Sequence, residues 1–188
     1  MSTRYNGCME RFRRGNGAAW LDLLSTLAGR YRDVQVDDID TPEALRAWLR
    51  DFDLEPSSAV TAEDVQTVTE TRELLHRLAV AAVRGARPAT ADVRRLNAAL
   101  GLDAGLQVAT GRAGLQPRRP TSVADAAGRL ARQAVVDLAG QGPGTLKACG
   151  DDTCSSIFLD HTGRRRWCTD LSCGNRSRVR AHRQRAGS

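Results

Sequence analysis

Aromatic residues, lysines and long apolar runs are all scarce in this sequence. Aromatic residues make up 4% of the 188 residues, so alanine, leucine and valine must supply most of the core. Lys147 is the single lysine among 28 basic residues, and arginine therefore carries nearly all of the positive charge. No stretch approaches the roughly 18 consecutive apolar residues of a transmembrane helix, so we expect no membrane partner.

Residue patterns typical of catalysis are equally sparse. The three histidines, His76, His161 and His182, lie far apart in the sequence. The chain has neither a glycine-rich phosphate-binding loop nor the Gly-x-Ser-x-Gly motif of a nucleophile elbow. We therefore expect that the protein is not an enzyme.

Positive charge is concentrated in the last quarter of the sequence. Residues 1–140 contain 19 basic and 18 acidic side chains, whereas residues 141–188 contain 9 basic and 4 acidic ones. The hydrophobic fraction of 41% and the charged fraction of 27% are typical of a globular protein, with room for one domain and a small module. The basic segment favours an acidic partner such as nucleic acid.

Two adjacent arginines, Arg13 and Arg14, precede a short apolar stretch, as in a twin-arginine export signal. Asp22 interrupts this stretch, and no small-residue cleavage site follows it. We therefore expect a cytoplasmic protein. Thiols stay reduced in the cytoplasm, so clustered cysteines there favour a metal site over disulfides.

Residues 1–140 are predicted to form a mainly helical domain. Apolar residues recur at helical spacing in five segments: 18–31, 41–52, 61–85, 90–101 and 122–140. Thr41, Thr61 and Ser122 are typical N-caps, and Asp64 completes a capping box with Thr61. Residues 101–122 contain short runs between glycines that predict one small hairpin.

A second, smaller module is predicted after residue 140. Glycine and proline indicate a linker over residues 141–146, which leaves residues 147–188 as the small module. Helices dominate this prediction and the strands are short, so the expected fold class is α+β, mainly α.

Four of the five cysteines fall within a stretch of 25 residues. Cys149, Cys154, Cys168 and Cys173 form two Cys-x4-Cys pairs with thirteen residues between them, whereas Cys8 stands alone and is expected to be a bystander. Two close pairs suit a tetrahedral zinc ion, because each tight turn delivers two thiolates. We expect one structural zinc with these four ligands. Four thiolate ligands leave no open position on the zinc ion for catalysis. The alternatives to a zinc site are two disulfides or four unligated thiols.

The order of the segments around these cysteines predicts a treble-clef-like module. Residues 155–167 are expected to form two strands around a Thr-Gly turn, which would bring Cys154 and Cys168 to the same end. Asn175 is the expected N-cap of a final helix, so that Cys173 would lie at its N-terminus. The helix dipole would stabilise a zinc centre that carries four thiolates there.

The final helix is predicted to be strongly basic. Its arginines are Arg176, Arg178, Arg180, Arg183 and Arg185. At 100° per residue, the first, third and fourth of these lie on one face, and the other two lie on the opposite face. The arginines are candidates for phosphate contacts, with Arg180 and Arg183 favoured and Arg176 expected to support the zinc centre. A solvated basic tail is the alternative.

The C-terminal residues resemble a known family of zinc fingers. Cys173-Gly174-Asn175-Arg176, the two Cys-x4-Cys pairs and the Trp167-Cys168 dipeptide are similar to the CGNR zinc finger. The family usually has lysine where this sequence has Arg178, which preserves the charge. The resemblance covers residues 147–185.

The preceding residues resemble the ABATE domain, which usually stands before this finger. Asp22, Thr26 and Arg30 match its opening motif, whereas Ser25 replaces the family's usual asparagine. The resemblance implies a bacterial stress-induced transcription regulator with a ligand-sensing N-terminal domain and a DNA-binding finger. It makes Asp22, Thr26 and Arg30 candidates for contacts with a small-molecule effector, and an ion pair between Asp22 and Arg30 is the alternative.

The expected function is therefore DNA-binding transcriptional regulation, with double-stranded DNA as the main partner. An RNA-binding zinc module and a protein-interaction adaptor are the alternatives, because phosphate contacts to DNA and RNA use the same side chains. The sequence indicates no particular oligomeric state.

Overall fold

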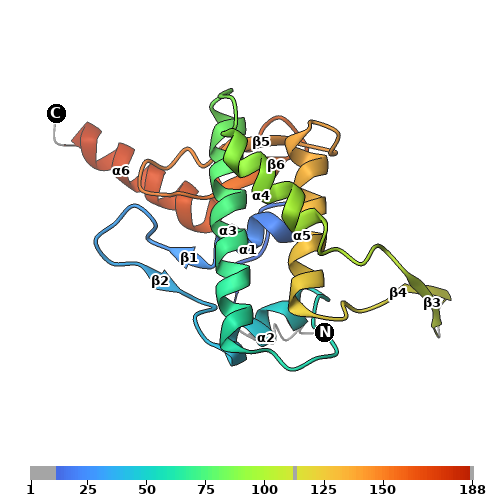
Figure 1. Cartoon of the computed structure of the whole chain (residues 1–188). Helices are drawn as coiled ribbons and strands as arrows, with labels where there is room; N and C mark the ends of the chain where they lie inside the picture. Colours follow the sequence, from blue (N-terminus) through green and yellow to red (C-terminus); the bar gives the residue numbers. More distant parts are fainter. Residues whose placement is uncertain (1–11, 112–113, 187–188) are drawn as a thin grey trace, which may run out of the picture.

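The structure is a computed structural model that describes residues 12–111 and 114–186, and it is mainly helical (Figure 1). The helices are α1 Ala19–Leu24, α2 Pro42–Asp51, α3 Ala62–Val83, α4 Thr90–Leu100, α5 Val123–Leu138 and α6 Asn175–Ala186. The strands are β1 Leu27–Ala28, β2 Val36–Asp37, β3 Val108–Gly111, β4 Gly114–Pro117, β5 Thr145–Ala148 and β6 Ile157–Asp160. Within the described ranges the strands form three antiparallel pairs, β1–β2, β3–β4 and β5–β6. The α+β, mainly α, fold class is therefore confirmed.

The long helix α3 lies at the centre of the helical body. It packs against α1, α2, α4 and α5, and the β3–β4 hairpin projects from the far side of the body (Figure 1). Trp20, Trp48 and Leu75 are fully buried between these helices. Two buried tryptophans compensate for the low aromatic content, because each removes far more apolar surface from water than an alanine does.

The predicted N-cap residues Thr41, Thr61 and Ser122 cap α2, α3 and α5 in the structure. Thr41 Oγ1 accepts a hydrogen bond from the N–H of Ala44 at 3.2 Å, and Ser122 caps α5 in the same way. Thr61 and Asp64 form the predicted capping box, in which each side chain accepts from the other's backbone N–H. The hairpin predicted within residues 101–122 is β3–β4.

The first helix is shorter than predicted. It ends at Leu24 rather than continuing to residue 31, and the chain then forms the short β1–β2 ribbon. Gly29 turns this ribbon with φ of 69°, a left-handed value that favours glycine. A Cβ at this position would lie 2.4 Å from the carbonyl oxygen of Val34, so the turn also requires the absence of a side chain. Helical periodicity alone did not reveal this turn.

The hairpin of the small module differs from the prediction. β6 is the expected first strand, but it pairs with β5, which precedes Cys149, and residues 164–167 form no strand. The cysteine turn at residues 149–154 therefore connects the two strands of the hairpin. The proposed second strand contains three consecutive arginines, whereas β5 supplies Leu146, which packs against the core.

The β5–β6 hairpin packs directly on the helical body. Ile157 and Leu159 of β6 are buried in the same apolar cluster as Trp20 and Leu75. The backbone N–H of Leu159 also donates to the carbonyl of Asn16 at 2.8 Å. The small module therefore shares its core with the helical body, which compensates for how little core a module of this size can form alone.

Truncation of Leu159 tests this shared core. We expect Leu159→Ala to lower the free energy of unfolding by about 2–5 kcal/mol, because it leaves a cavity between β6 and the body. Leu171→Ala is the matched control in the same module, since Leu171 is 87% exposed and its truncation should cost less than about 0.5 kcal/mol. Urea denaturation of the zinc-loaded protein measures both, and equal effects would contradict the shared core.

Candidate metal centre and basic helix

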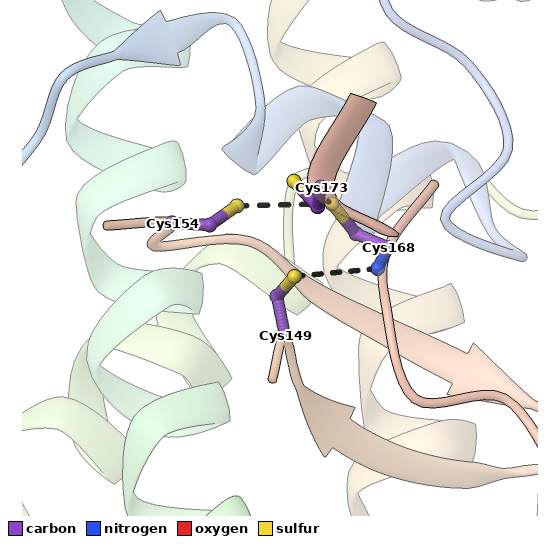
Figure 2. Close-up of side chains that lie close together, drawn as sticks. All are labelled: Cys149, Cys154, Cys168 and Cys173. Carbon is purple, nitrogen blue, oxygen red and sulfur yellow. Dashed lines mark hydrogen bonds between the residues drawn. The ribbon is translucent and has the colours of Figure 1, made fainter. Parts of the chain in front are cut away.

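Four cysteine side chains converge at one point in the small module (Figure 2). Cys149 follows β5, and Cys154 precedes β6 at the other end of the same turn. Cys168 lies in the loop after β6, and Cys173 lies in a π-helical turn, Asp170–Gly174, that leads into α6. Cys168 and Cys173 are buried, whereas Cys149 and Cys154 are partly buried. Cys8, the expected bystander, lies outside the described residues.

The spacing of the four sulfur atoms fits a single zinc ion. A tetrahedral zinc with sulfur ligands at about 2.3 Å has ligand atoms about 3.8 Å apart. The four Sγ atoms lie within 4.8 Å of one another, with 3.7 Å between Cys154 and Cys168 and 3.4 Å between Cys168 and Cys173. All four are free thiols rather than disulfide partners. The cluster can therefore hold one zinc ion, as predicted.

The crowded thiols also favour a cation electrostatically. A hydrogen bond with Cys149 lowers the pKa of Cys154, whereas hydrogen bonds with Cys149 and Cys154 raise the pKa of Cys168. One thiolate thus forms easily and makes ionisation of its neighbour harder. A divalent cation at the centre of the cluster would remove this conflict, because metal coordination deprotonates thiols outright.

Two backbone contacts bring the cysteine turn and the second pair together. The N–H of Cys168 donates to the Sγ of Cys149 at 3.4 Å, as marked in Figure 2. The N–H of Gly150 donates to the carbonyl of Arg166 at 2.9 Å. The loop 161–169 is therefore fixed to the first cysteine pair without the strand that the sequence suggested.

The helical segment begins earlier than predicted. Asn175 has helical torsion angles, φ of −64° and ψ of −45°, and is not an N-cap. Thr169 has that role, because its Oγ1 accepts from the N–H of Ser172 at 3.1 Å. Asn175 instead donates its side-chain amide to the carbonyl of Leu171 at 2.8 Å. Cys173 thus lies inside a π-helical turn, a feature that is frequent at functional sites.

The glycine of the Cys-Gly-Asn-Arg tetrad leaves room for the side chain of Asp170. A Cβ at Gly174 would lie 2.5 Å from Oδ1 of Asp170. That carboxylate accepts a hydrogen bond from Arg178 at 2.6 Å. A larger residue at position 174 would therefore displace the ion pair that lies beside the second cysteine pair.

Arg176 connects α6 to both halves of the cysteine cluster. Its Nη2 donates to the Sγ of Cys173 at 3.1 Å, and its Nε donates to Oδ2 of Asp151 at 2.9 Å. Burial acts to raise the pKa of Asp151, but hydrogen bonds from Thr153 and Arg176 outweigh it and lower the pKa to about 2. Asp151 is thus a permanent acceptor, and the structure gives Arg176 the supporting contact that the sequence suggested.

The remaining arginines of α6 fall into two groups. Arg178 pairs with Asp170, and Arg180 lies 3.2 Å from Asp151 and 3.5 Å from Asp152. Arg183 and Arg185 are exposed, and their side chains make no hydrogen bond or ion pair with any residue the structure describes. Arg180, which the sequence favours for phosphate contacts together with Arg183, lies beside two carboxylates, whereas Arg183 and Arg185 have no such partner in the described residues.

Sequence reasoning missed two residues at this centre. Arg13 donates to Ser156 at 3.2 Å and to Ser172 at 3.4 Å, which places its guanidinium between the two cysteine pairs. The nearby cysteines raise the pKa of Arg13 even though burial acts to lower it. Asp151 is the second, and an acidic residue inside the first Cys-x4-Cys pair was its only signal. Arg13 gave no local signal, because it lies over 130 residues away in sequence.

The candidate effector residues are engaged in contacts within the body. Asp22 accepts two hydrogen bonds from Asn16 at 2.9 Å, and burial raises its pKa. Thr26 accepts from Arg72 at 2.9 Å. Arg30 pairs with Glu73 and lines a cleft beside the small module. In the described residues, no hydrogen bond or ion pair joins any two of these three candidates, and neither Asp22 nor Thr26 lines this cleft.

Close to Arg30, a buried histidine faces the β1–β2 ribbon. The Nε2 atom of His76 lies 3.4 Å from the hydroxyl of Tyr31, and the two rings are 6.2 Å apart. Burial and then the positive charge of Arg30 lower the pKa of His76 to about 4. The imidazole is therefore neutral at pH 7.

None of the helices in the described part of the chain combines the length and apolar character needed to cross a membrane.

Metal analysis tests the cysteine centre. We expect about one zinc ion per chain, released by a strong chelator with a fall in melting temperature, because the centre joins two loops that have little core of their own. Cys168→Ser should lose the zinc, and Cys8→Ser is the matched control that should retain it. Retention of zinc by Cys168→Ser, or no zinc in the purified protein, would contradict this centre.

The pH dependence of stability tests His76. Its folded pKa lies below the unfolded value, so the unfolded state takes up a proton that the folded state does not. The free energy of unfolding should therefore fall as the pH decreases from about 6.5 towards about 4. His76→Gln should show a smaller loss between pH 7 and pH 5, measured by urea denaturation with zinc present. An equal loss in both proteins would show that His76 is not the cause.

Comparison with known families places both parts of the chain. Residues 17–142 match the family model ABATE, whose description is "Putative stress-induced transcription regulator". Residues 145–186 match the model of the CGNR zinc finger, and the four converging cysteines lie within that range. No curated protein and no solved structure gave a significant match. The chain therefore belongs to the ABATE family and carries a CGNR zinc finger after its ABATE domain.

Proposed function

We propose that the protein is a transcriptional regulator that binds double-stranded DNA through its zinc finger and senses a small molecule through its helical domain. The description of the ABATE family supports the regulatory role. The arginines of the finger and the direction of α6 support DNA as the partner. The same proposal makes this protein a binding protein of the cytoplasm and not an enzyme.

The observation that carries the DNA proposal is the balance of ion pairs in the finger. Each of its four acidic residues is already paired within the finger: Asp151 with Arg176 and Arg180, Asp152 with Arg180, Asp160 with Lys147, and Asp170 with Arg178. Four exposed arginines have no acidic partner among the described residues: Arg164, Arg166, Arg183 and Arg185. This uncompensated charge suits a polyanion, because phosphate contacts release counterions from DNA.

The shape of α6 favours duplex DNA over duplex RNA. The helix extends away from the body, with only its first turns attached to the finger (Figure 1). A projecting helix can enter the DNA major groove, which is about 12 Å wide. The major groove of A-form RNA is too narrow for such a helix. We therefore assign phosphate contacts to Arg183 and Arg185, while Arg176, Arg178 and Arg180 orient the helix.

We assign a structural role to the zinc ion. Cys149, Cys154, Cys168 and Cys173 would hold it as thiolates, and the ion would join the turn after β5 to the turn before α6. Four sulfur ligands leave no position for a water or a substrate. The zinc would therefore fix the direction of α6 rather than supply chemistry.

In this proposal, residues 1–140 form the sensing domain, residues 141–146 connect the two parts, and residues 147–188 form the finger. β5 starts at Thr145, within the connecting segment, and packs against α3 and α5. The short connection and the shared core mean that a ligand that alters the body can alter the position of α6.

Charge removal at the end of α6 tests DNA binding. We expect the double variant Arg183→Gln/Arg185→Gln to bind duplex DNA more weakly than the parent protein. The slope of log affinity against log salt concentration should also become shallower by about 1 for each arginine. Fluorescence anisotropy with a labelled duplex at several salt concentrations measures both quantities, with zinc bound throughout.

Arg94→Gln/Arg95→Gln on α4 is the charge-matched control, because both arginines are exposed on the helical body. It should retain the affinity and the salt slope of the parent protein. Competition with structured RNA separates the two polymers. Equal losses in the two double variants, or tighter binding to RNA than to duplex DNA, would contradict the proposal.

A further inference from the structure

A cleft of about 570 Å³ lies between the helical body and the finger. The body contributes residues around the β1–β2 ribbon, including Arg30 and Arg32, and the finger contributes residues 152–156 and Arg176. The volume is within the range of sites for small organic molecules, about 300–1,000 Å³. The cleft adjoins the zinc centre, because Cys154 and Arg176 border both.

The lining of the cleft is rich in positive charge. Four arginines line it, Arg13, Arg30, Arg32 and Arg176, against two aspartates, Asp38 and Asp152. The hydroxyl groups of Ser155 and Ser156 come from the finger side of the same cleft. Guanidinium and hydroxyl groups together are the donors that carboxylates and phosphates prefer.

The side chain of Arg30 is a second observation that points to a ligand in this cleft. Its side chain is only 8% exposed, and its Nη1 pairs with Glu73. Its Nη2 is buried and has no hydrogen-bond partner among the described residues. A buried donor without an acceptor is costly, so such a group usually has a ligand, an ion or water nearby. An oxyanion in the cleft would supply the acceptor after a small movement of Arg30.

A smaller apolar cavity adjoins this cleft. It has a volume of about 190 Å³, and its lining is mainly apolar, with Val80, Val83 and Ile157, although Arg84 lines it as well. Tyr31 and residues 154–156 line both cavities, so the two spaces share one wall. Tyr31 is 71% exposed there, although its ring is large and apolar. A charged compartment beside an apolar one matches a ligand with an anionic head and a short apolar chain.

We propose that this cleft binds a small organic oxyanion, a carboxylate or a phosphate monoester, whose short apolar chain occupies the adjoining cavity. This inference rests on the ligand-sensing part of the proposed function and names the class of its ligand. Arg30 and Arg32 bind the anionic head, and Val80, Val83 and Ile157 surround the chain. Ser156, which accepts from Arg13, presents its hydroxyl at the boundary between the two compartments.

The position of the cleft couples this ligand to the finger. Arg32 donates to the carbonyl of Thr153 at 3.1 Å, a direct contact between the β1–β2 ribbon and the cysteine turn. A ligand that contacts both sides stabilises their association, because it binds the docked arrangement better than a separated one. Arg176 lines the cleft and lies in the first turn of α6, where it contacts Asp151 of the cysteine turn and Cys173. Through Arg176, a ligand in the cleft can therefore also stabilise the position of α6.

Calorimetric titration of the zinc-loaded full chain tests the site with hexanoate, hexyl phosphate and hexan-1-ol. We expect saturable binding of at least one of the two anions at one site per chain, and none of the alcohol. Arg30→Gln should weaken this binding by about tenfold, the effect of losing a charged hydrogen bond. Arg32→Gln should weaken it several-fold, and Arg94→Gln on α4 should leave it unchanged.

The two anions distinguish the source of the oxyanion, because preference for hexanoate indicates a carboxylate and preference for hexyl phosphate indicates a phosphate monoester. Arg32 is exposed, so Arg32→Gln keeps the test decisive if Arg30→Gln does not fold. Absence of saturable binding of both anions, equal binding by hexan-1-ol, or equal weakening in Arg32→Gln and Arg94→Gln would overturn the inference.

DNA binding is measured on the same samples. Intact DNA binding without anion binding would refute the cleft and leave the DNA proposal standing. Anion binding without DNA binding would refute the DNA proposal and leave the cleft as a binding site.

Discussion

The finger depends on one electrostatic constraint: four sulfur atoms gather within 4.8 Å of one another. Thiolates at such a distance repel each other, and protonated thiols give little attraction. A cation that binds all four sulfurs turns this repulsion into the main force that joins the two loops. The cysteine turn after β5, the π-helical turn and the direction of α6 are all arranged around that cluster. The metal centre therefore determines where the basic helix points.

Ion pairs within the finger decide which arginines remain for a partner. Asp151 is central, because it receives Arg176 and Arg180 from successive turns of α6 and lies inside the first cysteine pair. These contacts hold the start of α6 against the metal centre, and they neutralise the positive charge of Arg176 and Arg180. Arg183 and Arg185 make no ion pair with these aspartates, so the uncompensated positive charge lies in the C-terminal half of α6. In the proposed function, the arginines that support the finger and those that contact DNA therefore lie in different parts of α6.

Local sequence signals predicted the helices and the cysteine cluster. Thr41, Thr61 and Ser122 cap their helices through contacts three residues away, and such contacts can be read from spacing alone. The two cysteine pairs can likewise be recognised from their spacing in the sequence. The hairpin prediction was wrong because strand pairing depends on a distant partner, since β6 pairs with β5 on the other side of the cysteine turn. The N-cap prediction for Asn175 was wrong because Thr169 offered a cap one and a half turns earlier.

The contacts between the body and the finger could not be predicted from local patterns. Arg13 reaches Ser156 and Ser172, and Arg32 reaches Thr153, across more than 100 residues of sequence. The sequence allowed an ion pair between Asp22 and Arg30, but Asp22 accepts hydrogen bonds from Asn16 and Arg30 pairs with Glu73. The cleft between the two parts exists only because β6 packs on the body, so no single segment of sequence indicates it.

X-ray absorption at the zinc edge of the zinc-loaded chain tests the central claim most directly. The four-cysteine centre predicts four sulfur ligands at about 2.3 Å and no nitrogen or oxygen ligand. A first shell with fewer than four sulfurs, or with a histidine nitrogen or a water oxygen, would contradict a closed structural site that determines the direction of α6.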